Sequence, residues 1–523
     1  MTPYADFTYF GLLLLYAAIP AILLGYCGLA NRQLALAVTL LFLWLQYKDY
    51  LSVRPTVPVR EIWIVCGYAA YQWALAALFL RFRAKPIFVP VLILAILPLA
   101  VAKYLPDISP ASKLGFAGIS YVSFRALDVI FSIRDKVVTA IPPVTYFAFL
   151  FFVPAVSSGP IDRFRRFSQD WIRRRSRVEF LNDLDIAIQR LFRGFLYKFI
   201  IAVQINSHWV IPAKAGTGLH VISYMYAYTF YLFFDFAGYS AFAIAFSYLL
   251  GVRTPENFNL PFLAPNIKDF WNRWHISLSF WFRDHIYMRF LLASAKGKWF
   301  KSKHTASYVG LFLTFGIMGI WHGIEWYYLL YGVYHAALLS GYDWFARWNK
   351  TRNWLSGGPG WHVVNILLTF HAIAFGLLLF SGHLAPRELP ERDEVVEKLT
   401  CVEITGYVWD RKKPNDPVLV DISMDGQIIG RVSAGDMRQD LLEKEYGNGR
   451  HGFHFKLPTS VQDGREHWVV PVIVGTAREI PGPFAITCLP KKAAANPGPA
   501  TPSAAPPAPA PPVPAPPATP VVR

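Results

Sequence analysis

The sequence predicts a polytopic α-helical membrane protein followed by a C-terminal all-β, sandwich-like domain. Of its 523 residues, 54% are hydrophobic and only 16% are charged, and the mean hydropathy is +0.32. Soluble globular chains carry about a quarter charged residues. Apolar stretches close to the length that crosses a bilayer recur through the first three quarters of the chain. Short runs of alternating apolar and polar residues follow. This composition excludes an ordinary soluble enzyme, a collagen and a small disulfide scaffold.

Ten apolar stretches are candidate membrane spans. They lie near residues 8–30, 34–47, 62–80, 86–105, 143–157, 187–212, 219–250, 306–320, 325–342 and 363–381. The stretch 219–250 is long enough for more than one element. The first stretch has no preceding basic region and no small-residue cleavage site, so we interpret it as a retained signal anchor.

The formal net charge of +17 comes from the membrane part of the chain, where basic runs alternate with apolar stretches. This distribution is typical of positive-inside loops and headgroup contacts, and it argues against a nucleic-acid surface. The strongest run is DRFRRFSQDWIRRRSR at residues 162–177. Placing it in the cytoplasm, together with the basic residues near 81–85 and 347–352, puts the N-terminus and the C-terminal region outside.

The sequence divides into four parts. Residues 1–385 form the membrane domain, 386–397 a linker, 398–490 the β domain and 491–523 a disordered tail rich in Pro and Ala. The β domain is predicted from alternating runs such as PVLVDISMDGQIIGRVSA, which are separated by Asp-Gly and Asn-Gly turns. Cys401 and Cys488 bracket this domain. A disulfide between them is plausible because terminal strands often lie side by side, and an extracytoplasmic compartment permits it.

Two histidines are candidates for chemistry. His322 lies in the apolar run FGIMGIWHGIEW, and a titratable group at membrane depth is costly enough to indicate function. The alternative is a core histidine hydrogen-bonded to a neighbouring helix. His275 lies in WNRWHISLSFWFRDHIY, whose mixture of Trp, Arg, Asp and His predicts an interfacial or re-entrant helix. The alternative for His275 is an interfacial anchor without chemistry.

Asp235, in YLFFDFAGYSAFAIAF, is a carboxylate among aromatic residues. It is interpreted as the partner of an arginine or as support for a catalytic histidine, with pairing favoured. No set of Cys and His residues has the spacing of metal ligands, so no metal site is predicted.

The motif WNRWHISLSFWFRDHIY, followed by MGIWHGIEWYYLLYGVYHA, resembles the membrane-bound O-acyltransferase (MBOAT) superfamily. The segments GISYVSFRALDVIFSIRD, FFVPAVSSGPIDRFRRF and FDFAGYSAFAIAF resemble its D-alanine export branch, which serves teichoic acid D-alanylation. Alginate O-acetyltransferase-like proteins form the related group that these segments resemble next. The resemblance covers residues 5–385 and implies a ring of tilted helices around a central tunnel.

The resemblance also implies roles for particular residues. His322 matches the catalytic histidine of the superfamily, and His275 matches its second functional position. The donor would be an acyl thioester on the phosphopantetheine arm of an acidic carrier protein in the cytoplasm, with no cofactor bound to this chain. Carrier or headgroup contacts are expected from a group of basic side chains: Arg163, Arg165, Arg166, Arg273 and Arg283.

The β domain departs from the D-alanine export branch and resembles, more loosely, small sandwich domains of polysaccharide-related glycosyltransferases. The expected function is transfer of an acyl group, D-alanyl favoured, to a hydroxyl of a surface glycan or glycolipid outside the bacterial inner membrane. A small membrane partner is a further expectation. Two alternatives stay open: an exopolysaccharide O-acetyltransferase, and a glycolipid transporter or flippase. A transporter should show inverted hydropathy repeats, which the sequence does not display.

Overall fold

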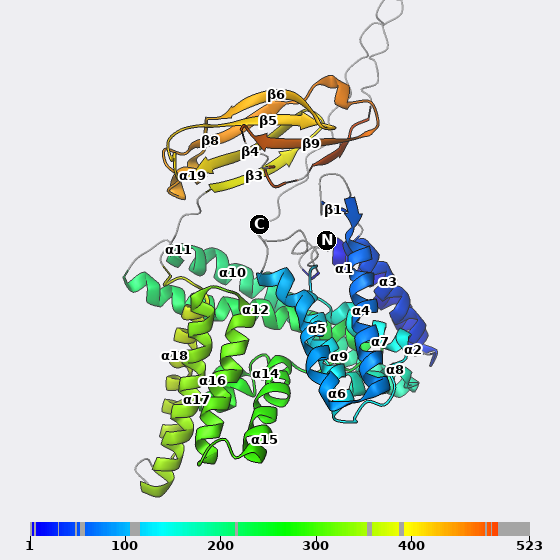
Figure 1. Ribbon diagram of the computed structural model, residues 1–523, viewed down its shortest axis with the longest axis vertical. Coiled ribbons are helices and arrows are strands. Elements are labelled where there is room, and N and C mark those ends of the chain that lie inside the picture. Colours follow the sequence, from blue (N-terminus) through cyan, green and yellow to red (C-terminus); the bar gives the residue numbers. More distant parts are fainter. Residues whose placement is uncertain are drawn as a thin grey trace, which may run out of the picture. The chain divides into compact units, whose positions relative to one another are not determined.

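The computed structural model divides the chain between residues 385 and 386 into a helical unit and a β unit (Figure 1). The residues that the structure describes are 3–4, 7–29, 31–47, 50–52, 58–104, 116–214, 218–352, 358–385, 392–475, 479–482 and 484–489. The predicted tail at 491–523 lies outside them.

The first half of the helical unit is a series of helices interrupted by one short hairpin. It contains α1 (Phe7–Leu13), the π-helical η1 (Leu14–Ala18), α2 (Ile19–Tyr26), α3 (Arg32–Tyr47), the hairpin β1 (Tyr50–Ser52) and β2 (Pro58–Arg60), α4 (Glu61–Phe82), α5 (Lys85–Tyr104), α6 (Ile119–Arg134), α7 (Pro143–Phe151), the 3-10 helix η3 (Val153–Ala155) and α8 (Phe164–Ile172).

The second half is also helical and includes three further π-helical segments, η4, η5 and η7. It contains α9 (Arg177–Phe195), η4 (Leu196–Ala202), α10 (Val203–Ile205), η5 (Asn206–Val210), α11 (Ile211–Lys214), α12 (Leu219–Leu249), the 3-10 helix η6 (Pro261–Leu263), α13 (Ile267–Trp271), α14 (Ile276–Phe282), η7 (Arg283–Tyr287), α15 (Met288–Gly297), α16 (Lys303–His322), α17 (Trp326–Arg352) and α18 (Pro359–Phe380).

Five helical stretches among the described residues are long and apolar enough to cross a membrane. They are Phe7–Tyr26, Glu61–Phe82, Pro86–Tyr104, Leu219–Leu249 and Pro359–Phe380. The sequence predicted ten candidates, so half of them meet this criterion of length and composition. The region 219–250, which was long enough for more than one element, is the single 31-residue helix α12.

Helices α16 and α17 form a closely packed hairpin beside α18 (Figure 1). A Cβ added at Gly319 would lie 2.4 Å from the carbonyl oxygen of Tyr328, and one added at Gly332 would lie 2.2 Å from that of Phe315. The two backbones therefore approach to a distance that only glycine permits. This contact fixes the C-terminal end of α16, where His322 lies.

The β unit is an antiparallel sandwich, as the sequence predicts. Its strands are β3 (Arg392–Leu399), β4 (Glu403–Asp410), β5 (Val418–Met424), β6 (Gln427–Ala434), β7 (Asp436–Met437), β8 (Arg450–Lys456), β9 (Glu466–Ile473) and β10 (Ala485–Thr487), with the short helix α19 (Gln439–Glu443). The described strands form two four-stranded sheets in the orders β3-β4-β8-β7 and β10-β9-β5-β6. Buried side chains of both sheets, such as Ile404 and Val469, share one hydrophobic core.

The start of the β unit corrects one predicted boundary. Strand β3 begins at Arg392, inside the range 386–397 that was expected to be a linker. Its sequence RDEVVEKL is mostly charged, so apolar alternation gave no signal for a strand there. Strand β3 is instead formed by its antiparallel pairing with β4.

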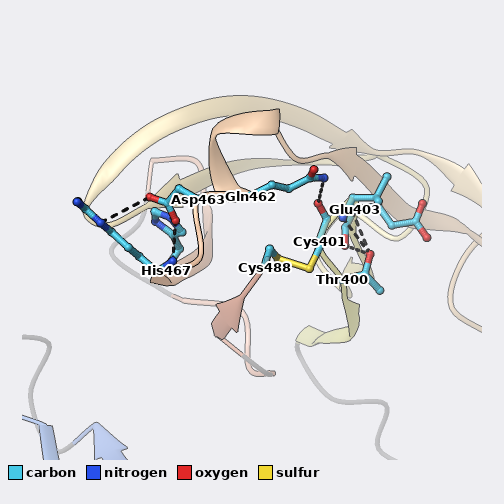
Figure 2. Close-up of a disulfide and its surroundings, with 9 residues drawn as sticks. Thr400, Cys401, Glu403, Gln462, Asp463, His467 and Cys488 are labelled. Carbon is cyan, nitrogen blue, oxygen red and sulfur yellow. Dashed lines mark hydrogen bonds and ion pairs between the residues drawn. A yellow bond between two sulfur atoms is a disulfide. The ribbon is translucent and has the colours of Figure 1, made fainter. Parts of the chain in front are cut away.

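Cys401 and Cys488 form a disulfide (Figure 2), with 5.6 Å between their Cα atoms and a sequence separation of 87. The predicted pair is present, although not for the predicted reason. Strands β3 and β10 belong to different sheets, so the terminal strands are not hydrogen-bonded neighbours. Cys401 lies between β3 and β4 and Cys488 follows β10, so the bond links the two sheets of the sandwich.

Candidate active site

His275 and His322 line the same cavity in the helical unit, which has a volume of about 300 Å³. The cavity wall is largely aromatic and is contributed by α6, α12, α13, α14, α16, α17 and α18. Its other lining residues are Tyr121, Ser158, Leu232, Asp235, Phe236, Tyr239, Trp271, Trp274, Leu278, Met318, Trp321, Tyr331, Leu377 and Phe380. The structure thus brings together two histidines that are 47 positions apart in the sequence.

The backbone of His275 has a left-handed conformation, with φ 42° and ψ 51°, directly before α14. This conformation is costly for a residue other than glycine and persists only where neighbouring structure imposes it. The amide of Ile276 donates to the carbonyl of Asn257 at 3.0 Å, and the Ser277 hydroxyl donates to the Asn257 side chain at 2.6 Å. These bonds hold the chain on the C-terminal side of His275 in place.

The His275 side chain is only 6% exposed and packs among aromatic rings. The ring of Phe236 meets it edge-on with 4.8 Å between centroids, and the ring of Tyr121 lies nearly parallel to it at 6.5 Å. The Tyr121 hydroxyl is 3.5 Å from Nε2 of His275, at the long end of the hydrogen-bond range. Orientation of this imidazole therefore comes mainly from packing.

His322 is the last residue of α16 and is half-buried. Its ring lies 4.5 Å from that of Trp321 and meets Phe380 of α18 edge-on at 4.8 Å. After His322 the chain becomes fully extended at Gly323. A Cβ added at Gly323 would lie 2.6 Å from the ring of Tyr328. Glycine at this position therefore lets the next helix pack directly beside the histidine.

Asp235 also lines the cavity, and its carboxylate forms an ion pair with Lys198 of η4. The sequence favoured a pairing role with an arginine. The pairing is observed, but the cation is a lysine. The sequence did not identify Lys198 as this partner, because it lies in the apolar run LYKFIIA. Its approach to Asp235 depends on the packing of η4 against α12.

Arg163 is an internal anchor of the helical unit. Its guanidinium pairs with Asp128 of α6 at 2.8 Å and with Asp284 of η7 at 2.9 Å. The same Asp128 carboxylate lies 3.0 Å from Nε2 of His285. These contacts tie α6 to the segment that continues from His275, so Arg163 is not the free surface cation that the basic run indicated.

The other four arginines that were predicted to contact a carrier or headgroups differ in whether they have an ion-pair partner. Three have an acidic partner close in sequence: Arg166 with Asp162, Arg273 with Asp269, and Arg283 with Asp284. Arg165 is exposed, and among the described residues its side chain has no ion-pair partner. Its side chain therefore remains available for an acidic surface or for lipid headgroups.

Several residues of the site were not singled out in the sequence. Tyr121 lies in GISYVSFRALD, and neither its aromatic character nor its spacing distinguishes it from the other tyrosines of this chain.

The described residues include no group of three or more His, Cys, Asp or Glu side chains that could hold a metal ion.

An aromatic cavity with two imidazoles suits acyl transfer. A histidine takes and returns protons near neutral pH, and exclusion of water by an aromatic wall protects a reactive acyl group from hydrolysis. The fold and this cavity define a membrane-embedded acyltransferase. Residues 24–382 match the membrane-bound O-acyltransferase family, MBOAT, and the chain belongs to this family. It is therefore an O-acyltransferase.

The most informative relatives are bacterial. The chain is 39% identical over 396 residues to a teichoic acid D-alanyltransferase of Bacillus subtilis (strain 168), a match that covers 73% of this chain and 98% of the relative. It is 41% identical over 308 residues to the protein of the same name from Streptococcus thermophilus, covering 56% and 74%. A probable alginate O-acetylase AlgI from Azotobacter vinelandii is 33% identical over 227 residues, 43% of each chain. The predicted resemblance to the D-alanine export branch is confirmed.

Proposed function

We propose that the protein transfers a D-alanyl group from a carrier-protein thioester in the cytoplasm to a hydroxyl of a glycan or glycolipid outside the bacterial inner membrane. The observation that carries this proposal is the cavity lined by both His275 and His322 in a chain that matches 98% of a teichoic acid D-alanyltransferase. By contrast, the match to the probable alginate O-acetylase covers less than half of the length of that relative, so the D-alanyltransferase match is the stronger guide.

In the proposed reaction, His322 is the general base. It removes the proton of the acceptor hydroxyl as the oxygen attacks the thioester carbon. The C–S bond then breaks, the acyl group remains on the acceptor oxygen, and the proton passes from His322 to the departing thiolate. His275 lies on the same cavity and holds the thioester carbonyl while negative charge develops on its oxygen. Asp235 acts at a distance through its pair with Lys198.

The donor is proposed to approach from the cytoplasmic side as the phosphopantetheine arm of an acidic carrier protein. The exposed Arg165 is the predicted contact residue that is best placed to attract such a carrier, because no described side chain neutralises it. Phosphopantetheine belongs to the donor, so no cofactor bound to this chain is required. A small membrane partner is compatible with this arrangement.

The β unit is proposed to be extracytoplasmic. Its disulfide between Cys401 and Cys488 supports this side, since structural disulfides persist in oxidising compartments. There the β unit would hold the acceptor glycan or a partner protein. Because the match to the Bacillus subtilis relative covers 73% of this chain, the acceptor need not be a teichoic acid.

Donor selection tests the proposal. The full chain in nanodiscs is incubated separately with D-alanyl-carrier protein and with acetyl-carrier protein, and loss of each thioester is followed with and without an acceptor glycan. We expect acceptor-dependent loss of the D-alanyl thioester only. Loss of the acetyl thioester alone would contradict the proposal.

Exopolysaccharide O-acetylation is the second candidate function. The identity of 33% over 227 residues to a probable alginate O-acetylase favours it, and the same two histidines would serve that reaction. The donor experiment distinguishes the two, because an acetyl donor lacks the α-ammonium group of a D-alanyl donor.

A further inference from the structure

The C-terminal end of α16 needs hydrogen-bond partners that the helix itself does not supply. The last four carbonyl groups of an α-helix have no intrahelical donor. In α16 these include the carbonyls of Ile320 and Trp321, the two residues before His322. Because Gly323 is fully extended, the chain leaves the helix without returning to cap them. In a membrane domain, water is a poor substitute for the missing donors.

The last two residues of α5 supply these donors from more than 200 positions away. The Tyr104 hydroxyl donates to the carbonyl of Ile320 at 2.6 Å. The Lys103 ammonium donates to the carbonyl of Trp321. The same ammonium lies 5.2 Å from the centroid of the Trp321 ring, within the range of a cation–π interaction. A cation at this position also offsets the partial negative charge of a helix C-terminus.

We propose that Lys103 and Tyr104 are positioning residues for His322. The ring of Trp321 lies 4.5 Å from that of His322, and both rings line the cavity. Lys103 restrains both the backbone and the ring of Trp321, so it restrains the surface against which the His322 imidazole rests. This inference rests on the proposed role of His322 as the base.

Lys103 also lines a second cavity of about 330 Å³, together with Glu61 and Ser120. The experiment must therefore distinguish positioning of His322 from substrate binding in this second cavity. An ammonium group there could instead bind an anionic part of the acceptor. A positioning role predicts an effect on kcat, whereas substrate binding predicts an effect on KM.

The test measures steady-state D-alanyl transfer by the full chain in nanodiscs for five variants: Lys103→Met, Lys103→Arg, Tyr104→Phe, His322→Ala and Lys301→Met. Lys301 is exposed in the loop before α16 and serves as the matched lysine control. We expect Lys103→Met to lower kcat by about tenfold to a hundredfold, because a misplacement of about 1 Å costs up to about 10²-fold in rate. KM for donor and acceptor should change by less than about twofold.

The remaining variants decide between explanations. Lys103→Arg keeps the cation and should recover most of the lost kcat, Tyr104→Phe should lower kcat less than Lys103→Met, and Lys301→Met should match the parent. A raised KM with unchanged kcat, or full activity of Lys103→Met, would overturn the inference. If Lys103→Met does not fold, the kcat and KM of Tyr104→Phe decide the same question. Activity of His322→Ala would overturn the proposed function itself, and that outcome is distinct from the others.

Discussion

The ammonium of Lys198 forms an ion pair with the carboxylate of Asp235 at the wall of the histidine cavity. Lys198 lies in the π-helical η4, and a Cβ added at Gly238 would lie 2.8 Å from the Lys198 backbone nitrogen. The close approach of η4 to α12 therefore places the Lys198 ammonium next to the Asp235 carboxylate. The lysine thereby offsets the negative charge that Asp235 brings to the cavity wall.

The first prediction concerns this pair. Lys198→Met and Asp235→Asn should each lower the thermal unfolding midpoint by about 2–4 °C, because each leaves a partly buried partner without its counter-ion. The double variant should lose less than the sum of the two, since it leaves no unpaired charge. Thermal unfolding in nanodiscs measures these effects. Loss of transfer activity by folded Asp235→Asn but not by folded Lys198→Met would show that Asp235 acts on the site without Lys198.

The second prediction separates two arginines that are two positions apart. Arg163→Met should destabilise the helical unit by about 2–4 kcal/mol, because the buried carboxylate of Asp128 would lose its guanidinium partner, which is itself partly exposed. Arg165→Glu should leave stability unchanged and raise the Kd for an acidic carrier by about threefold to tenfold at low salt. Unfolding midpoints and carrier titrations at two salt concentrations measure both. Equal carrier affinity for the parent and Arg165→Glu would remove Arg165 from the proposed contact surface.

The third prediction places the β unit. In membranes from intact cells, Cys401 and Cys488 should resist a membrane-impermeant thiol reagent until a reductant is added. The remaining two cysteines, Cys27 and Cys66, are free and provide the internal reference for labelling. Replacing Cys401 by Ser should destabilise the β unit by about 2–5 kcal/mol. Thiols at 401 and 488 that react only after the cytoplasmic face is opened would reverse the proposed topology.

The fourth prediction concerns pH and the β unit. His467 lies 2.9 Å from Asp463 (Figure 2) and 2.7 Å from Asp425. Hydrogen bonds to these two carboxylates raise the pKa of His467. A raised folded-state pKa contributes stability that is complete below the unfolded value of about 6.5 and is lost as pH rises through the folded value. Hydrogen exchange of β9, corrected for intrinsic rates, should therefore differ most between the parent and His467→Gln near about pH 5. A difference that grows towards about pH 9 would contradict this assignment.

The sequence allowed the prediction of the two-part fold because both hydrophobic patterns are strong. Long apolar stretches and alternating strands depend on local composition. The pairing of His275 with His322 as candidate chemistry came instead from the resemblance of their two motifs to the membrane-bound O-acyltransferase superfamily. The start of β3 could not be predicted, because RDEVVEKL pairs as a strand although most of its residues are charged.

The contacts that support the site could not be predicted, because they join segments far apart in the sequence. Lys103 reaches Trp321 across 218 positions, and Arg163 reaches Asp284 across 121. An arginine in a basic run has the same local pattern whether it faces an acidic partner protein or a buried aspartate. Only the packing of α6 and η7 distinguishes Arg163 from Arg165.

The central claim is that His322 carries acyl transfer in the cavity that it shares with His275. Its most direct test is transfer of labelled D-alanine from the carrier protein to acceptor hydroxyls in proteoliposomes containing the parent, His322→Ala or the control His371→Ala, whose histidine is exposed on α18. We expect His322→Ala to fold and insert normally and to lose at least about 10²-fold in rate, the lower end of what general base catalysis contributes. His371→Ala should retain the parent rate. Transfer by His322→Ala at the parent rate would contradict the account.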